Sequence, residues 1–242
     1  MRALHSRLER AKRLRSDDSG VTMTELLITF MLTILILAMI GSFFVSVTKI
    51  TSASNEIRNS NDAASNIVNE VTSAVRFSTD LVKSDGSTDF AVLNGSNRDT
   101  LEIYALVDTA PTADPLNIKP SKIKFELLTD GQGKLYVKET KCPGTASGAI
   151  WVFTSPCTAR TLGTGLLATD DVKNQLFTYR DSGGTAMTLS GLTPLSTTQR
   201  DAVASITVSV RVRVTGTVQT TANPVLITNT VVLRNLGLDT AS

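Results

Sequence analysis

The sequence predicts an α+β protein in which a long N-terminal helix packs on an antiparallel β-sheet. The segment 26–48 has no charged side chain. The segment 49–77 places apolar residues three and four positions apart, which is the period of a helix with one buried face. After residue 100, several stretches alternate apolar and polar residues, as half-buried strands do.

The uncharged segment is long enough to cross a membrane. At 1.5 Å per residue, about 23 helical residues extend roughly 35 Å, which spans the hydrocarbon core of a bilayer. A helix in the core of a soluble domain is rarely apolar on all sides over this length. We therefore expect residues 21–48 to form a membrane-inserted helix.

The first 20 residues form a basic leader, with six Lys or Arg against three Asp or Glu, so the net charge of +2 arises there. By the positive-inside rule, we expect the N-terminus in the cytoplasm and the C-terminal part outside it. A secretory signal peptide has its apolar core before the cleavage site, whereas here the apolar core follows the leader. The overall charge gives no reason to expect a nucleic-acid partner.

Glu25 is the one carboxylate at the start of the apolar helix. A carboxylate there is costly unless it is paired, so it is a candidate functional residue. Alternatively, Glu25 lies at the headgroup level without a partner.

These residues resemble the signature of the type IV prepilins: a basic leader ending in Gly20, an apolar Val21, Glu25 and an unbroken apolar helix. Phe is commoner than Val at the first position. The resemblance, which covers about the first fifth of the chain, implies that a prepilin peptidase cleaves between Gly20 and Val21 and methylates Val21. It also implies assembly with other pilin subunits through the helix. Cleavage there would create an amine at Val21, one helical turn from Glu25. In a bundle of identical, offset helices, that amine can pair with Glu25 of a neighbouring helix and set the register.

The amphipathic segment 49–77 continues this helix, because no Pro or paired Gly separates the two segments. We expect one helix over 22–77, about 80 Å long, with Gly41 as a place for a bend. The apolar stripe predicted to pack on the sheet consists of Ile50, Ile57, Ala64, Ile67, Val68, Val71, Ala74 and Val75.

Residues 78–242 form the predicted β-rich head domain. We expect a loop over 78–100 and strands at 101–107, 122–128, 134–139, 206–214 and 225–235. We expect irregular structure over 158–200, with one strand near 175–179. Residues 149–153 are expected to form a short strand or a packed apolar loop. In 206–214 the predicted inward residues are Ile206, Val208, Val210, Val212 and Val214, and Thr207, Ser209, Arg211 and Arg213 face outward. The final strand pair resembles the ends of PilW-like minor pilins and J-type pseudopilins.

The two cysteines, Cys142 and Cys157, favour a disulfide in a domain outside the cytosol. Closing such a loop contributes about 3 kcal/mol in the chain-entropy model. The alternative is two free buried thiols. The single histidine, His5, is in the leader, so we expect no histidine metal site and no histidine base for a nucleophile.

No motif in the sequence points to an enzyme or a cofactor. The alternation of Asp85, Ser87 and Asp89 resembles the start of a calcium loop, but Phe90 stands at the position of the turn glycine and Ser96 at that of the bidentate glutamate. We therefore interpret this segment as a solvated loop.

Basic side chains gather on the predicted hairpin 122–138, at Lys122, Lys124, Lys134 and Lys138. They suit contact with DNA or another anionic polymer, or they form an ordinary solvated face. Trp151, inside the cysteine loop, either anchors a protein partner or fills core.

The expected function is that of a minor pilin or pseudopilin, membrane-anchored before assembly and at the cell surface or in a pseudopilus afterwards. Two alternatives remain: a surface receptor for DNA or another anionic polymer, and a single-pass anchored protein that is never processed.

Overall fold

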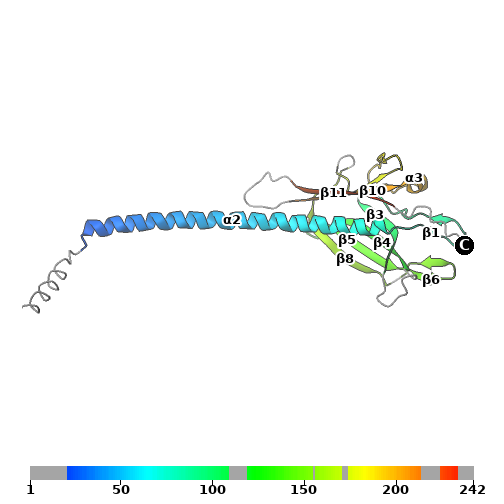
Figure 1. Cartoon of the computed structure of the whole chain (residues 1–242), viewed down its shortest axis with the longest axis horizontal. Helices are drawn as coiled ribbons and strands as arrows, with labels where there is room; N and C mark the ends of the chain where they lie inside the picture. Colours follow the sequence, from blue (N-terminus) through cyan, green and yellow to red (C-terminus); the bar gives the residue numbers. More distant parts are fainter. Residues whose placement is uncertain (1–20, 109–118, 155, 171–173, 214–223, 234–242) are drawn as a thin grey trace, which may run out of the picture. The chain divides into compact units, whose positions relative to one another are not determined.

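The computed structural model describes residues 21–108, 119–154, 156–170, 174–213 and 224–233. The chain divides into two compact units, one up to Ser52 and one from Ala53 onward. Helix α2, Met23–Arg76, is the first described element (Figure 1). It confirms the predicted helix over 22–77, and it continues without interruption through Gly41.

In the first unit, the described residues are all exposed. Its large apolar side chains range from 42% exposed at Val47 to 85% at Met23. Thr29, Thr33 and Thr48 donate their hydroxyls to the backbone carbonyls four residues earlier, at 2.7–2.8 Å. Hydroxyls that are satisfied inside their own helix suit an apolar environment.

The second unit contains a seven-stranded sheet, whose described pairings are all antiparallel. Its main path runs in the order β11-β10-β8-β5-β4-β3, and β9 pairs with β10. The strands are β3 (Thr100–Asp108), β4 (Lys119–Thr129), β5 (Leu135–Pro143), β8 (Thr158–Leu166), β9 (Phe177–Arg180), β10 (Ser205–Val212) and β11 (Val225–Val232).

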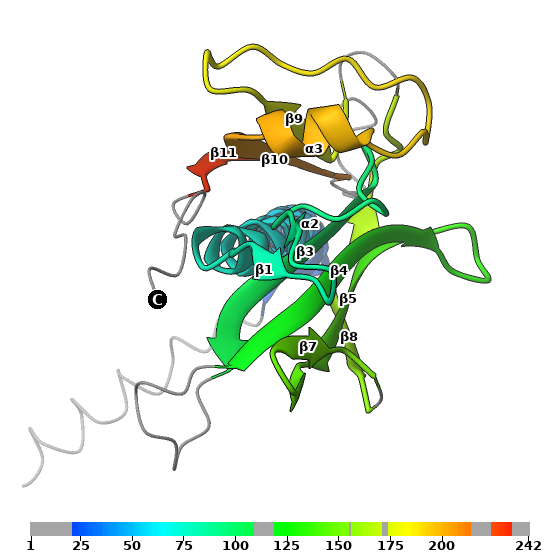
Figure 2. The same cartoon turned by 90° about the vertical axis from the view of Figure 1, so that its right-hand side faces the viewer.

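The sheet curls around the part of α2 that belongs to the second unit. β8 and β10 share only the pair Leu166 and Val212, so the sheet divides there into two halves. Figure 2 shows β3, β4, β5 and β8 on one side of α2 and β9, β10 and β11 on another. Side chains from both halves reach the helix: Asn229 of β11 donates to Thr72 at 3.0 Å, and Arg160 of β8 pairs with Glu70 at 2.9 Å.

The core forms between this helix and the inner face of the sheet. The predicted stripe is buried from Ala64 to Val75, whereas Ile50 and Ile57 are 64% and 43% exposed. The buried face therefore begins at Ser60. The largest fully buried side chains are Tyr179, Phe125, Phe177, Ile67, Leu101, Ile103, Ile123, Leu176 and Ile206.

Most of the predicted strands are confirmed: 101–107, 122–128, 134–139, 206–214 and 225–235 correspond to β3, β4, β5, β10 and β11, and β9 lies near the strand predicted at 175–179. Val214 and residues 234–235 lie outside the described residues. The prediction of irregular structure over 158–200 is wrong for Thr158–Leu166, which forms β8, and for helix α3, Thr197–Ala202.

Two short hairpins complete the described part of the fold. β1 (Leu81–Val82) pairs with β2 (Thr88–Asp89) inside the predicted loop 78–100. β6 (Thr145–Ser147) pairs with β7 (Ile150–Val152), so 149–153 contains the expected short strand. Bridges from Ser78 to Ala105 and from Val92 to Ile103 cover the outer edge of β3.

Thr207 departs from the predicted alternation of β10. It was expected to face solvent, but it is only 6% exposed. Its hydroxyl bonds with that of Thr230 on β11 at 2.8 Å and accepts a hydrogen bond from Arg180 Nε of β9 at 3.2 Å. Neighbouring strands and the Arg180 side chain therefore cover the outward face at this position.

Candidate functional site

The start of α2 carries the predicted processing and assembly residues. Gly20 lies outside the described residues. Val21 is 68% exposed, just before the helix. The Thr22 hydroxyl accepts a hydrogen bond from the Glu25 backbone N–H at 3.3 Å and lies 3.5 Å from the Glu25 carboxylate. Thr22 therefore caps the helix, and the exposed Glu25 lies in the first turn, where a negative charge complements the helix dipole.

Helix α2 is long and apolar enough to cross a membrane, and its most apolar window is not buried by any described part of the chain. From Met23 to Thr48, Glu25 is the only charged residue. This segment therefore suggests a membrane anchor or signal. The chemistry available here is a carboxylate at the edge of an otherwise apolar helix surface.

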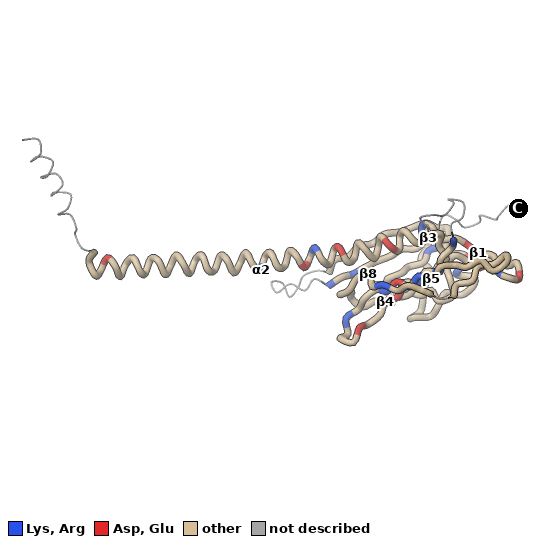
Figure 3. The backbone as a smooth tube through the Cα atoms, turned by 90° about the horizontal axis from the view of Figure 1, so that it is seen from below, with Lys and Arg blue, Asp and Glu red and all other residues tan. Residues whose placement is uncertain are grey.

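The four candidate lysines do not form a single unpaired basic patch. Lys122 pairs with Glu102 of β3 at 2.7 Å, and Lys124 pairs with Glu126. Lys138 lies directly opposite Glu126 in the register of β4 and β5. Figure 3 shows basic and acidic positions side by side along these strands. Acidic residues thus offset the positive charge on the outer face of the sheet.

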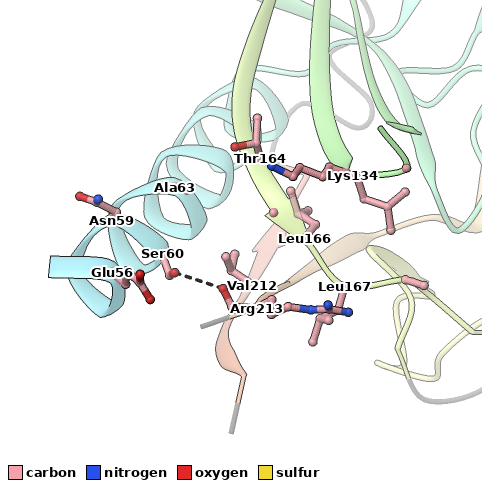
Figure 4. Close-up of a pocket in the computed structure, with 14 residues that line it drawn as sticks. Glu56, Asn59, Ser60, Ala63, Lys134, Thr164, Leu166, Leu167, Val212 and Arg213 are labelled. Carbon is pink, nitrogen blue, oxygen red and sulfur yellow. Dashed lines mark hydrogen bonds between the residues drawn. The ribbon is translucent and has the colours of Figure 1, made fainter. Parts of the chain in front are cut away.

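Lys134, the fourth lysine, lies at a cavity of about 580 Å³ instead of on the sheet face. The cavity lies between α2, the β4–β5 turn, β8 and the end of β10 (Figure 4). Its lining is mixed, with Leu135, Leu166 and Val212 beside the charged Lys134, Glu56 and Arg213. The Ser60 hydroxyl donates to the Arg213 carbonyl across it at 3.3 Å.

The disulfide between Cys142 and Cys157 is present, which confirms the prediction. It closes the segment that contains β6 and β7. Trp151 is half-buried, and Phe153 stacks on Tyr104 of β3 with ring centroids 4.9 Å apart. The Tyr104 hydroxyl donates to Asp89 at 3.0 Å. Aromatic contacts therefore hold the loop against the edge of the sheet.

The segment Asp85–Asp89 has the geometry of a turn. The Asp85 carboxylate accepts hydrogen bonds from the Ser87 N–H at 2.9 Å and from the Ser87 hydroxyl at 2.6 Å. These bonds lower the pKa of Asp85 below its ordinary value. Within the described ranges, no cluster of three His, Cys, Asp or Glu residues is arranged to hold a metal ion.

A charge network between the sheet and the helix was not predicted. Arg160 on β8 donates through Nε to Glu139 of β5, and its Nη2 lies 2.9 Å from Glu70 of α2. The hydrogen bond with Glu139 raises the pKa of the Arg160 guanidinium above its ordinary value. The sequence gives no local signal for this contact, because it depends on the register that places Glu139 opposite Arg160.

The architecture is that of the type IV pilin-like folds: a long N-terminal helix, apolar in its first part, packed on an antiparallel sheet. Comparison with protein-family models finds no match for this chain, and no curated protein sequence matches it.

Proposed function

We propose that the chain is a structural subunit, a minor pilin or pseudopilin, of a type IV pilus-like or type II secretion-like filament. The precursor spans the membrane, with its basic N-terminus in the cytoplasm and its β-rich part outside. A prepilin peptidase cleaves between Gly20 and Val21 and methylates Val21. The helix then joins those of other pilin subunits, and the subunit becomes part of a surface pilus or a pseudopilus.

The observation that carries this proposal is the contrast along α2. From Ser60 to Val75 the helix buries one face against its own sheet, whereas the large apolar side chains before Ser52 are exposed. A helix that is apolar on all sides needs lipid or other helices around it. Lipid supplies this cover in the precursor, and the helices of other pilin subunits supply it in a filament.

The proposal assigns Glu25 to pairing with the Val21 amine of a neighbouring subunit. Glu25→Ala is therefore expected to leave expression and membrane insertion intact and to reduce recovery in the sheared filament fraction. Losing a charged pair worth about 1.4 kcal/mol changes an equilibrium about tenfold, so a reduction of about this size is expected. Quantitative immunoblotting of membrane and sheared fractions measures it.

Two variants separate charge from shape and position. Glu25→Gln keeps the size of the side chain and is expected to lose incorporation as Glu25→Ala does. Asp62→Ala removes an exposed carboxylate of the same helix beyond the apolar segment, and it is expected to assemble normally. Normal incorporation of both Glu25 variants would refute the pairing.

Intact-mass and N-terminal analysis of protein from the native host tests the processing step. The expected mature chain begins at N-methylated Val21 and has lost two hydrogens to the disulfide. A chain that still begins at Met1 would support the alternative of an unprocessed anchored protein. The receptor alternative has less support, because two of its four lysines are paired with acidic residues and a third faces one.

A further inference from the structure

Arg160 is the one side chain in the described ion pairs that joins three structural elements. It lies on β8 and contacts Glu139 of β5 and Glu70 of α2. Glu139 is 8% exposed at its side chain, and Glu70 is 42% exposed. A link thus runs from a buried carboxylate of the sheet, through one guanidinium, to the helix.

The chemistry of arginine suits this position. Its planar guanidinium can donate to two carboxylates at once, which a lysine ammonium does with less geometric control. A buried carboxylate without a cation is costly, so Glu139 needs Arg160. These residues line a cavity of about 420 Å³ between α2 and the sheet, together with Ser73, Ile123 and Lys141. The ion pairs therefore hold the helix where apolar packing is incomplete.

The position of Arg160 depends on a weakly held strand. Toward β10, β8 is paired only through Leu166, so over Thr158–Thr164 its ladder is with β5 alone, and that ladder has two register shifts. The last pair is Thr158 with Lys141. Cys142 follows Lys141 on β5, and Cys157 precedes Thr158 on β8, so the disulfide lies next to this last pair. Arg160 lies two residues after Thr158, near the same end of β8.

We propose that Arg160 is a positioning residue that fastens α2 to the sheet, and that the Cys142–Cys157 disulfide keeps it within reach of Glu70. Without the disulfide, the start of β8 separates from β5 more often, and the link to the helix is lost with it. This coupling rests on contacts inside the second unit and does not depend on the proposed filament role.

Hydrogen exchange of the full chain in detergent, read by mass spectrometry, tests the coupling. The variants are Arg160→Met, the pair Cys142→Ser and Cys157→Ser, and all three changes together. Each of the first two is expected to raise exchange over helix residues 69–75 about tenfold, and the combination is expected to raise it no further. Arg211→Met, on β10 and outside the network, is the matched control and is expected to leave this stretch unchanged.

A disulfide that only stabilised the fold would raise exchange in all strands alike, and its effect would add to that of Arg160→Met. Additive effects would therefore overturn the coupling. Unchanged exchange over 69–75 in Arg160→Met would overturn the fastening role itself.

Glu70→Gln gives a second test that leaves the buried Glu139 paired with Arg160. It is expected to raise exchange over 69–75, but less than Arg160→Met does, because the buried carboxylate keeps its cation, and to have no effect once the disulfide is absent. If the serine pair does not fold, folded wild-type protein and Glu70→Gln are compared before and after reduction by dithiothreitol, which is itself oxidised to a cyclic disulfide. An equal effect of Glu70→Gln in both states would refute the proposal.

Discussion

Asp80 is a half-buried carboxylate whose charge the fold disfavours. Burial raises its pKa above the ordinary value of 3.8, and repulsion from Asp201 and Asp89 adds to this. The hydrogen bond from the Ala91 N–H, at 2.6 Å, acts in the opposite direction but does not outweigh burial. Because the pKa of Asp80 is higher in the folded than in the unfolded protein, folding favours the protonated carboxyl. The contribution of Asp80 to stability is therefore full below pH 3.8 and is lost as the pH rises through the folded pKa.

Asp80→Asn is therefore expected to stabilise the protein above the folded pKa and to have little effect near pH 3. The asparagine oxygen can still accept from Ala91, and it cannot ionise. Thermal unfolding of wild type and variant, measured by circular dichroism from pH 3 to 7, gives the difference in Tm as a function of pH.

Asp85→Asn is the matched control, because Ser87 lowers the pKa of this carboxylate. Its contribution is present above the ordinary pKa and is lost as the pH falls, so the sign is reversed. The asparagine variant should be slightly less stable than wild type near pH 7. The same direction of change in both variants would contradict this account of Asp80.

At the scale of elements, β8 approaches α2 closely at Gly163. A Cβ atom there would lie 2.9 Å from Ile67 Cδ1 and 3.1 Å from the Ala63 carbonyl oxygen. The first atom can move, but the second belongs to the helix backbone. Gly163→Ala is therefore expected to force strand and helix apart and to destabilise the protein by about 1–3 kcal/mol, the usual cost of overpacking. Urea unfolding in detergent measures this change.

Gly131→Ala, in the turn between β4 and β5, is the control for the glycine substitution itself. A Cβ at this position meets no atom within 4 Å. The expected effect is neutral or a gain of about 0.4–1 kcal/mol, since alanine restricts the unfolded chain. Equal effects of the two substitutions would mean that the contact with α2 does not matter.

The strands that alternate apolar and polar residues were the ones that the sequence predicted. β3, β4 and β10 place apolar residues inward at every second position, such as Leu101, Phe125 and Val208, and these were predicted. β8 has no such pattern, because its inner face carries Arg160 for an ion pair and Gly163 for a close approach. Helix α3 had a local signal, the capping box of Ser196 and Gln199, which the prediction did not use.

The candidate sites divide in the same way. The disulfide pair could be predicted from the sequence, because an even cysteine count is visible there. Glu25 is visible as a lone charge before an apolar run, and its role in assembly stays a prediction. The ion pair of Lys122 with Glu102 and the Arg160 network could not be identified, because they depend on which strands are neighbours and in which register. Processing at Gly20 and Val21, and methylation of Val21, stay predictions.

At the scale of the whole molecule, α2 belongs to both units and differs in its surroundings between them. In the second unit it supplies eight buried residues between Ser60 and Val75. Both halves of the curled sheet contact this part of the helix. The second unit therefore needs its helical segment as part of the core. The described hydrophobic core contains no residue before Ala64.

This division predicts where the chain can be shortened. A protein beginning at Ala53 keeps every buried residue of α2 and is expected to be soluble without detergent, with cooperative urea unfolding. A protein beginning at Phe77 loses Ile67, Val71 and Val75, each 0% exposed. Removing single large core side chains already costs about 2–5 kcal/mol each, and domains have only about 5–15 kcal/mol in total. The shorter protein should therefore show no cooperative transition. If the 53–242 protein failed to fold, the apolar segment would contribute to the stability of the second unit. Lipid and neighbouring helices could then not be the only surroundings of the apolar segment.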